Sequence, residues 1–293
     1  MEYHTFSELR ESYAFILPLM IFILIFVLLP VLGTFINSFF RDISFMQRKF
    51  ILFENYKQLF NDSDFYGAIR FTILFILVSV PLEIILGLIF ALILNEAVPF
   101  RGFLRACVLL PWAIPSAISG RLWELIFNYN YGLANFLCIK LGISTGPINW
   151  LGSSLGAFLG IVIADVWKTT PFVTIILLAG LSSIPIELYS QAKVDGSNFL
   201  QRFHKVTMPL LKPVLIVALL FRTIDALRIF DLVYVLTHGG PGGATTSLSL
   251  YSYRYFLAGD FGYGSAISVV LFVIAFILSV VYIKLGRFAE LGT

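Results

Sequence analysis

Two long runs without a charged residue limit what this chain can fold into. Residues 13–40 and 261–283 contain no Asp, Glu, Lys or Arg. A helix needs about 20 predominantly apolar residues to cross a bilayer, so each run is long enough to span a membrane. Apolar residues make up 59% of the sequence and charged residues 13%, far from the averages of soluble domains. We therefore predict an all-α integral membrane protein.

The first run could instead be a secretory signal. It is too long for the apolar part of a signal peptide, and it follows Glu2, Glu8 and Glu11 rather than a basic start. We expect it to be retained as a membrane span.

Six transmembrane helices are predicted, at about 13–40, 68–95, 104–127, 155–181, 210–236 and 262–286. They would form one domain over 13–287, between a cytoplasmic N-terminal segment, 1–12, and a cytoplasmic tail, 288–293. With the N-terminus in the cytoplasm, slightly more Lys and Arg residues fall inside than outside, which is a weak positive-inside bias. The chain is thus expected to be a multi-pass protein of the cell membrane, in contact with lipids.

Several classes of chemistry have no support in the sequence. No GxxxxGK[ST] motif is present, so the chain has no phosphate-binding loop of this type. The three histidines are scattered, and Cys107 and Cys138 fit no CxxC pattern. A net charge of +3 gives no reason to expect nucleic acid as a partner. We predict no catalytic residue, no metal site and no cofactor bound by this chain.

A polar loop at 182–209 separates the fourth and fifth predicted spans. Its pattern predicts two short helices, with Ser183 and Ser197 as N-caps and Gly196 at a left-handed turn between them. Met208-Pro209 is expected to end the second helix. From these residues alone, the loop is either a helical hairpin on the membrane surface or a docking site for a soluble partner.

The 182–209 loop resembles the cytoplasmic signature loop of permease subunits in binding-protein-dependent ABC importers. That motif begins Glu-Ala-Ala, reaches Asp-Gly after two more residues and ends in Leu-Pro. Here Ser190 and Gln191 replace its first two residues. The resemblance implies an ATPase-coupling role for eight residues of this chain: Glu187, Ser190, Gln191, Ala192, Asp195, Gly196, Met208 and Pro209.

The resemblance extends over roughly 200 residues of the carbohydrate branch of these permeases. It is carried, in the family's order, by Phe100-Arg101-Gly102, Leu110-Pro111, DVWKTTPF around Trp167, LLFRTIDALRIFD around Asp225, Gly239-Gly240-Pro241 with Thr245, and Gly264-Ser265-Ala266-Ile267. The segments around Trp167 and Asp225 look most like trehalose- and maltose-type disaccharide permeases. Permeases for glycerol phosphate and other solutes share much of the pattern.

The resemblance also implies partners. These are a second, homologous permease subunit, two ATP-binding subunits that hold ATP and Mg, and an extracytoplasmic solute-binding protein or lipoprotein that delivers the sugar. Gly239, Gly240 and Pro241 would lie in an outer loop that faces this receptor. The permease itself would not be an enzyme.

Charged residues inside the predicted spans are costly, at about 2.5–3.5 kcal/mol each at the bilayer centre on insertion scales. Asp165 and Lys168 lie three apart and can pair on one helix face. In the fifth span the signs alternate at every third residue. These six residues either lock helices together or line the translocation pathway or its gate: Asp165, Lys168, Arg222, Asp225, Arg228 and Asp231. Glu83 is expected to be the structural partner of an arginine.

Two alternatives remain open on the sequence. The four tryptophans, Trp112, Trp123, Trp150 and Trp167, can anchor span ends at the membrane interface or stack on a sugar. The intramembrane carboxylates could instead couple transport to an ion gradient in a secondary transporter. That class usually has more spans and paired broken repeats, which we do not find here.

Overall fold

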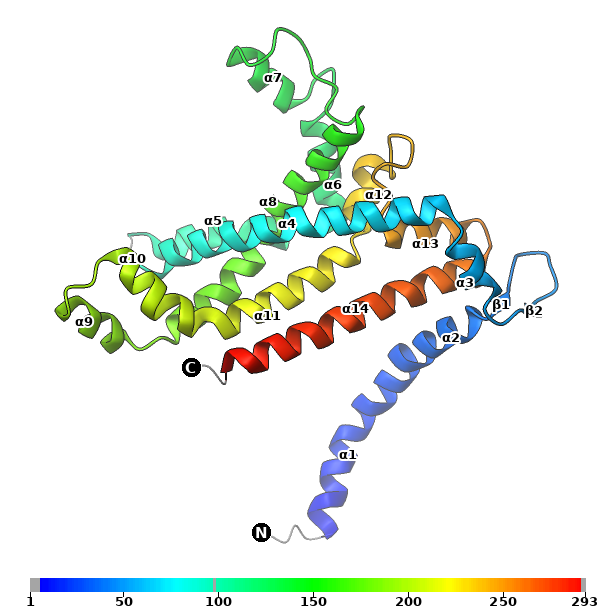
Figure 1. Cartoon of the computed structure of the whole chain (residues 1–293), viewed down its shortest axis with the longest axis horizontal. Helices are drawn as coiled ribbons and strands as arrows, with labels where there is room; N and C mark the ends of the chain where they lie inside the picture. The colour runs from blue at the N-terminus through cyan, green and yellow to red at the C-terminus, as the bar shows by residue number, and fades with distance from the viewer. Residues whose placement is uncertain (1–5, 97–98, 291–293) are drawn as a thin grey trace. The chain divides into compact units, whose positions relative to one another are not determined.

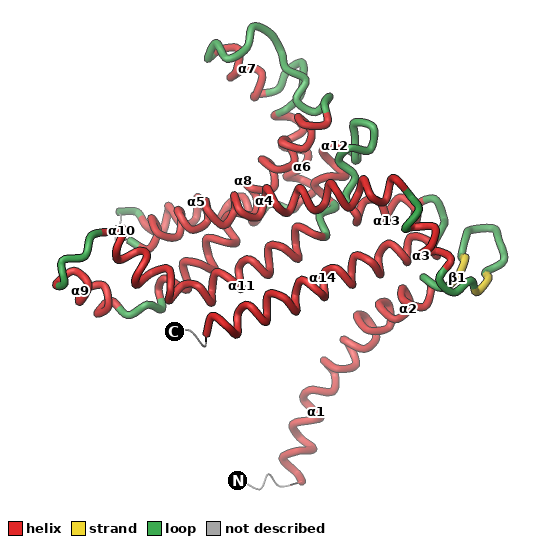
Figure 2. Tube along the Cα trace, in the orientation of Figure 1, coloured by secondary structure: helices red, strands yellow, loops and turns green. Residues whose placement is uncertain are grey.

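The computed structural model describes residues 6–96 and 99–290, whose regular elements are helices except for one short strand pair (Figures 1 and 2). The N-terminal segment 1–12 and the tail 288–293 therefore lie partly outside the described residues. The elements are α1 (Phe6–Ile23), η1 (Leu24–Leu28), α2 (Leu29–Asn37), β1 (Phe40–Arg41), β2 (Lys49–Phe50), α3 (Glu54–Leu59), α4 (Ser63–Asn95), α5 (Arg101–Ala113), α6 (Ser116–Ile126), α7 (Leu133–Lys140), α8 (Ser154–Ser182), α9 (Ile186–Val194), α10 (Phe199–Arg202), η2 (Phe203–Thr207), α11 (Met208–Leu227), α12 (Asp231–Thr237), α13 (Leu248–Leu257) and α14 (Phe261–Glu290).

The chain divides into two compact units. The first comprises residues 1–62 and 252–270, and the second comprises residues 63–251 and 271–293. In the first unit, β1 and β2 form an antiparallel hairpin after α2. Buried Asn55 fixes the start of this hairpin, because its amide donates to the carbonyl oxygens of Ser38, at 2.8 Å, and Phe40, at 2.9 Å.

The second unit is built around α4 and α8, which pack along one another, while α11 packs against both. Glycine allows a close approach of the backbones at two of these helix–helix contacts. A Cβ at Gly87 of α4 would lie 2.6 Å from Cγ1 of Val173 on α8, and one at Gly180 of α8 would lie 2.9 Å from side chains of α11. Small residues at such contacts are typical of helices that pack within a membrane.

Four of the described helical segments are long and apolar enough to cross a membrane: Tyr13–Asn37, Ser63–Asn95, Ser154–Ser182 and Phe261–Gly286. They agree with four of the predicted spans. The third predicted span, 104–127, is instead two helices, α5 and α6, bent by 94°. The break follows from Ile114-Pro115, because the residue before a proline avoids the helical conformation, and Ile114 is extended with ψ 129°.

The fifth predicted span, 210–236, is also broken, since α11 ends at Leu227 and α12 begins at Asp231. Arg228 caps the C-terminal end of α11, and Asp231 lies in the first turn of α12. Helix dipoles favour a cation at a C-terminal end, where Arg228 lies, and an anion at an N-terminal end, where Asp231 lies. The alternating charges therefore mark a helix boundary as well as a polar patch.

Met208-Pro209 does not end a helix, so that prediction was wrong. Residues 199 to 227 form one helical run through α10, η2 and α11, and the N–H of Met208 donates to the carbonyl of Phe203. A proline lacks an N–H and its ring crowds the carbonyl four residues earlier. The wider π turn before Pro209 accommodates both effects, and η1 does the same before Pro30, where the N–H of Leu29 donates to Leu24.

Candidate functional site

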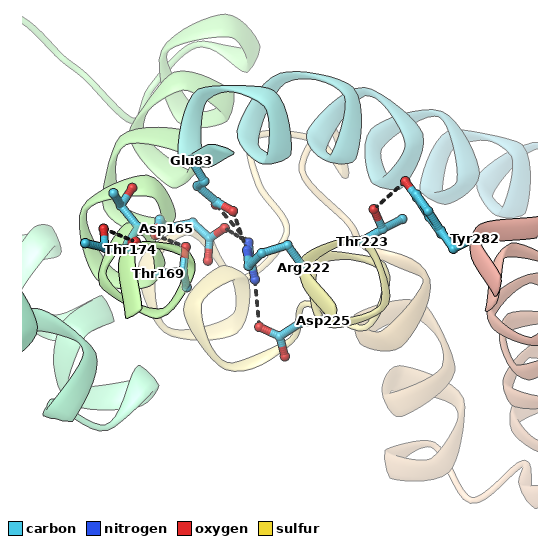
Figure 3. Close-up of polar contacts among 9 residues, drawn as sticks. Glu83, Asp165, Thr169, Thr174, Arg222, Thr223, Asp225 and Tyr282 are labelled. Atoms are coloured by element: carbon cyan, nitrogen blue, oxygen red, sulfur yellow. Dashed lines mark hydrogen bonds and ion pairs between the residues drawn. The ribbon is translucent and has the colours of Figure 1, made fainter. Parts of the chain in front are cut away.

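Arg222 lies at the centre of a buried charged cluster in the second unit (Figure 3). Its side chain, on α11, is 1% exposed. The guanidinium donates to both carboxylate oxygens of Glu83 on α4, through Nε and through Nη2 at 2.8 Å. Nη2 also donates to Asp165 on α8 at 2.9 Å. One side chain thereby joins three helices.

The cluster runs from the protein interior to its surface. Nη1 of Arg222 donates to Asp225 at 2.7 Å, and Asp225 also accepts from Arg228 at 3.3 Å. The side chains of Asp225 and Arg228 are 52% and 69% exposed, respectively. Buried charges persist in proteins when they are paired and hydrogen-bonded, as the inner members are. The outer two are free to interact with a ligand or with water.

The structure decides between some of the sequence expectations for these charges. Glu83 is the partner of an arginine, as predicted. Asp165 could pair with Lys168 by spacing alone, but its ion pair in the structure is with Arg222. The planar guanidinium can bind two carboxylates at once, which the ammonium of a lysine, a point charge on a flexible stem, does less well. Asp231 is exposed at the start of α12 and makes no ion pair with the cluster among the described residues.

A cavity of about 450 Å³ adjoins this cluster. One wall is aromatic: the rings of Trp112 and Phe172 stack with centroids 5.8 Å apart, and Phe221 meets Phe172 edge-on at 6.3 Å. The other lining residues are polar, charged or aliphatic: Thr169, Leu220, Arg222, Ile224, Asp225, Arg228 and Ser279. Aromatic rings and hydrogen-bonding groups in one cavity suit a polar ligand that also has an apolar face.

The aromatic wall was largely missed by sequence reasoning. Phe172 and Phe221 are two of 30 phenylalanines, and nothing in their spacing sets them apart. Trp112 had been weighed as an interfacial anchor or a stacking residue, and it lies in the cavity wall. Trp123 and Trp167 instead pack edge to face with centroids 5.8 Å apart.

The 182–209 loop contains the two predicted helices, α9 and α10, with the predicted left-handed turn at Gly196, where φ is 77°. Its caps differ from the prediction. Pro185 and Asn198 are the N-cap residues, and Asn198 forms a capping box with Gln201. Ser183 and Ser197 instead donate their hydroxyls to the carbonyls of Gly180 and Ala192.

The surface of this loop is accessible to a partner. The predicted coupling residues Glu187, Ser190, Gln191, Asp195, Gly196 and Pro209 are exposed, and Ala192 and Met208 are half-buried. Large apolar side chains lie exposed beside them on both helices: Ile186, Leu188, Val194, Phe199 and Leu200. A short helical loop with exposed apolar residues is a suitable docking surface for a protein.

The loop after α12 makes tight turns. Backbone φ is positive at His238 and Gly239 and again at Gly242 and Gly243. The hydroxyl of Thr245 donates to the carbonyl of Gly240 at 2.7 Å. The loop is therefore held in shape by its own hydrogen bonds rather than being a loose connector.

The chain is similar to known transport proteins. The family described as "Binding-protein-dependent transport system inner membrane component" matches residues 83–286. The trehalose/maltose transport system permease protein MalF of Thermococcus litoralis is 54% identical over 284 residues, covering 97% of this chain and 96% of the relative. The trehalose transport system permease protein SugA of Mycobacterium tuberculosis is 38% identical over 244 residues, covering 83% of this chain and 77% of the relative.

Among solved structures, a bacterial ABC transporter involved in the import of the acidic polysaccharide alginate contains a chain similar to this one. The TM-score is 0.83 at 25% sequence identity, and the match covers 95% of each chain.

Proposed function

Because the chain belongs to the family of binding-protein-dependent transport system inner membrane components, we propose that the cavity beside Arg222 is part of the route by which this ABC permease subunit imports its sugar. The observation that carries the proposal is that the aromatic residues Trp112, Phe172 and Phe221 line the same cavity as the polar pair Asp225 and Arg228. Pyranose rings present C–H faces to aromatic rings and hydroxyls to charged and amide groups. A neutral disaccharide of the trehalose or maltose type, as named for the Thermococcus litoralis relative, fits this chemistry.

The helices that flank the 182–209 loop also carry the cavity. Asp165, Thr169 and Phe172 lie on α8, which leads into the loop, and Phe221, Arg222 and Asp225 lie on the helical run that leaves it. At 1.5 Å per residue, Asp165 is about 25 Å along α8 from Ser182, where the helix ends and the loop begins. The ion pair between Asp165 and Arg222 joins the two helices at the cavity, so a displacement of the loop would move both walls together.

ATP binding and hydrolysis would occur in two partner subunits docked on the 182–209 loop, with Gly196 as the tight turn between its two helices. Those subunits, and not this chain, would hold ATP and Mg. ATP shifts the transporter between inward- and outward-facing states only if it binds the two with different affinity. A second permease subunit would complete the pathway, and an extracytoplasmic receptor would deliver the sugar near Gly239, Gly240 and Pro241.

We infer six spans with a cytoplasmic N-terminus. The α5–α6 pair would count as one span, and α11 as another. Helix α11 has 20 residues, about 30 Å, which matches the hydrocarbon thickness. Its charged end explains why hydropathy alone does not identify it.

The test is receptor-stimulated ATPase activity and uptake by the complete complex in proteoliposomes. Receptor loaded with trehalose, maltose and glycerol phosphate would be compared. Phe172→Leu removes a ring face from the cavity and should weaken sugar-dependent stimulation about fivefold, because an aromatic contact contributes about 1 kcal/mol. Phe158→Leu on the same helix is the matched control, since Phe158 packs against Phe71 and not in the cavity. Equal effects of the two substitutions would contradict the assignment of the cavity.

A further inference from the structure

The segment between α6 and α8, residues 128–150, has a polar interior. Asn135 lies at its centre and is 4% exposed. The amide of Asn135 donates to the carbonyls of Tyr129, at 3.0 Å, and Ile148, at 3.1 Å. Its oxygen accepts from the N–H of Ile148 at 3.0 Å and from Nε1 of Trp150 at 2.8 Å. One buried amide thus holds both ends of the segment together.

Much of the exterior of the same segment is apolar. Seven large side chains on and around α7 are between 44% and 70% exposed: Tyr131, Leu133, Phe136, Leu137, Ile139, Leu141 and Ile143. Lys140 is the one charged residue in 128–150. Its Nζ lies 5.6 Å from the centroid of the Phe136 ring, so the lysine stem runs along apolar surface while its ammonium can reach water.

This distribution is the reverse of that in a water-soluble segment, which buries its apolar side chains and exposes its amides. Contiguous apolar surface of this kind marks an interaction with a partner or a membrane. The flanking helices also expose apolar side chains, Leu125 on α6 and Leu155 on α8. In Figure 1, α7 lies beyond the end of α6.

We propose that residues 128–150 lie in the interfacial region of the lipid bilayer, in the leaflet opposite the 182–209 loop, with α7 in the plane of the membrane. Helix α7 has eight residues, about 12 Å, so it is too short to span. Tyr129, Tyr131 and Trp150 would lie at headgroup level, where such rings are enriched.

Lipid fits this surface better than the extracytoplasmic receptor does. A receptor must dissociate in each transport cycle, which would return the apolar side chains to water. The segment also offers a single charge, whereas docking surfaces for soluble proteins have a polar rim. Lipid covers the surface throughout the cycle.

The experiment measures the collision of spin labels with oxygen, which concentrates in lipid, and with a water-soluble nickel chelate. Labels are attached to Leu141→Cys or Ile143→Cys in the complete complex in nanodiscs, with both native cysteines replaced by alanine. Gln58→Cys, at an exposed polar position on α3, is the matched control. We expect the ratio of oxygen to nickel collisions at positions 141 and 143 to shift clearly toward oxygen relative to position 58.

Other outcomes would overturn the proposal. A ratio like that at position 58 would place the segment in water. Low collision rates with both reagents would place it against another subunit. A loss of collisions that appears only when the loaded receptor is added would identify it as a receptor contact.

Discussion

Replacing Arg222 with methionine is expected to destabilise the complex more than any other single change in the charged cluster. The substitution keeps an unbranched apolar stem but removes the guanidinium. Glu83, which is fully buried, and Asp165, which is 7% exposed, would then face each other without a cation. Breaking a buried ion pair by removing one partner costs about 3–5 kcal/mol, because the remaining charge is left uncompensated.

The same reasoning predicts a much smaller effect at Asp225. The side chain of Asp225 is about half exposed, so water can hydrogen-bond to the side chain at this position in place of Arg222 when the carboxylate is neutralised. Exposed ion pairs contribute up to about 1 kcal/mol to stability. Asp225→Asn is therefore the matched control for stability. A triple variant, Arg222→Met with Glu83→Gln and Asp165→Asn, should recover most of the loss, because it leaves no unpaired buried charge.

The assay is thermal unfolding of the assembled complex in nanodiscs, followed by tryptophan fluorescence, with size-exclusion chromatography to count intact complexes. The expected order of stability is wild type, Asp225→Asn, the triple variant and then Arg222→Met. If Arg222→Met unfolded at the same temperature as Asp225→Asn, the cluster would not hold α4, α8 and α11 together, and the reasoning would fail.

Three further predictions address transport and the segment at residues 128–150. Gly196→Val should abolish uptake while the protein remains inserted, because valine is strained at φ 77° by roughly 1–2 kcal/mol. The control is Gly142→Val, which should leave uptake intact although Gly142 has φ 71° and is equally free of neighbouring atoms. Asp225→Asn should reduce transport rates more than complex yield, and an equal loss of both would assign the residue to structure alone. Asn135→Leu should speed hydrogen exchange at the Ile148 amide, because that N–H loses its acceptor. A buried polar group without a hydrogen-bond partner costs about 1–3 kcal/mol. Unchanged exchange would contradict the role of Asn135.

The sequence predicted features that depend on local or composition signals. Long apolar runs located α4, α8 and α14 to within a few residues. Gly196 was assigned a left-handed turn because few other residues tolerate it. The break at Ile114-Pro115 was not predicted, although the proline is in the sequence and its effect on the preceding residue is steric.

Features that depend on contacts between distant residues could not be predicted in the same way. The partners Glu83 and Arg222 are 139 residues apart, and only packing of α4 against α11 brings them together. Spacing showed that Asp165 and Lys168 could meet, but not that Arg222 would compete for the carboxylate. Asn198 rather than Ser197 caps α10 because Gln201 completes its capping box, a signal that was present and was overlooked.

The cluster and the aromatic wall have different roles in this interpretation. A neutral sugar gains little from a fully buried guanidinium that already has three carboxylate partners, so we infer that Arg222, Glu83 and Asp165 act on the helices rather than on the ligand. The ligand would instead meet the rings and the exposed pair Asp225 and Arg228. Asp225 accepts hydrogen bonds from both Arg222 and Arg228. It is therefore the residue through which a bound sugar could alter the ion pair that connects α8 and α11.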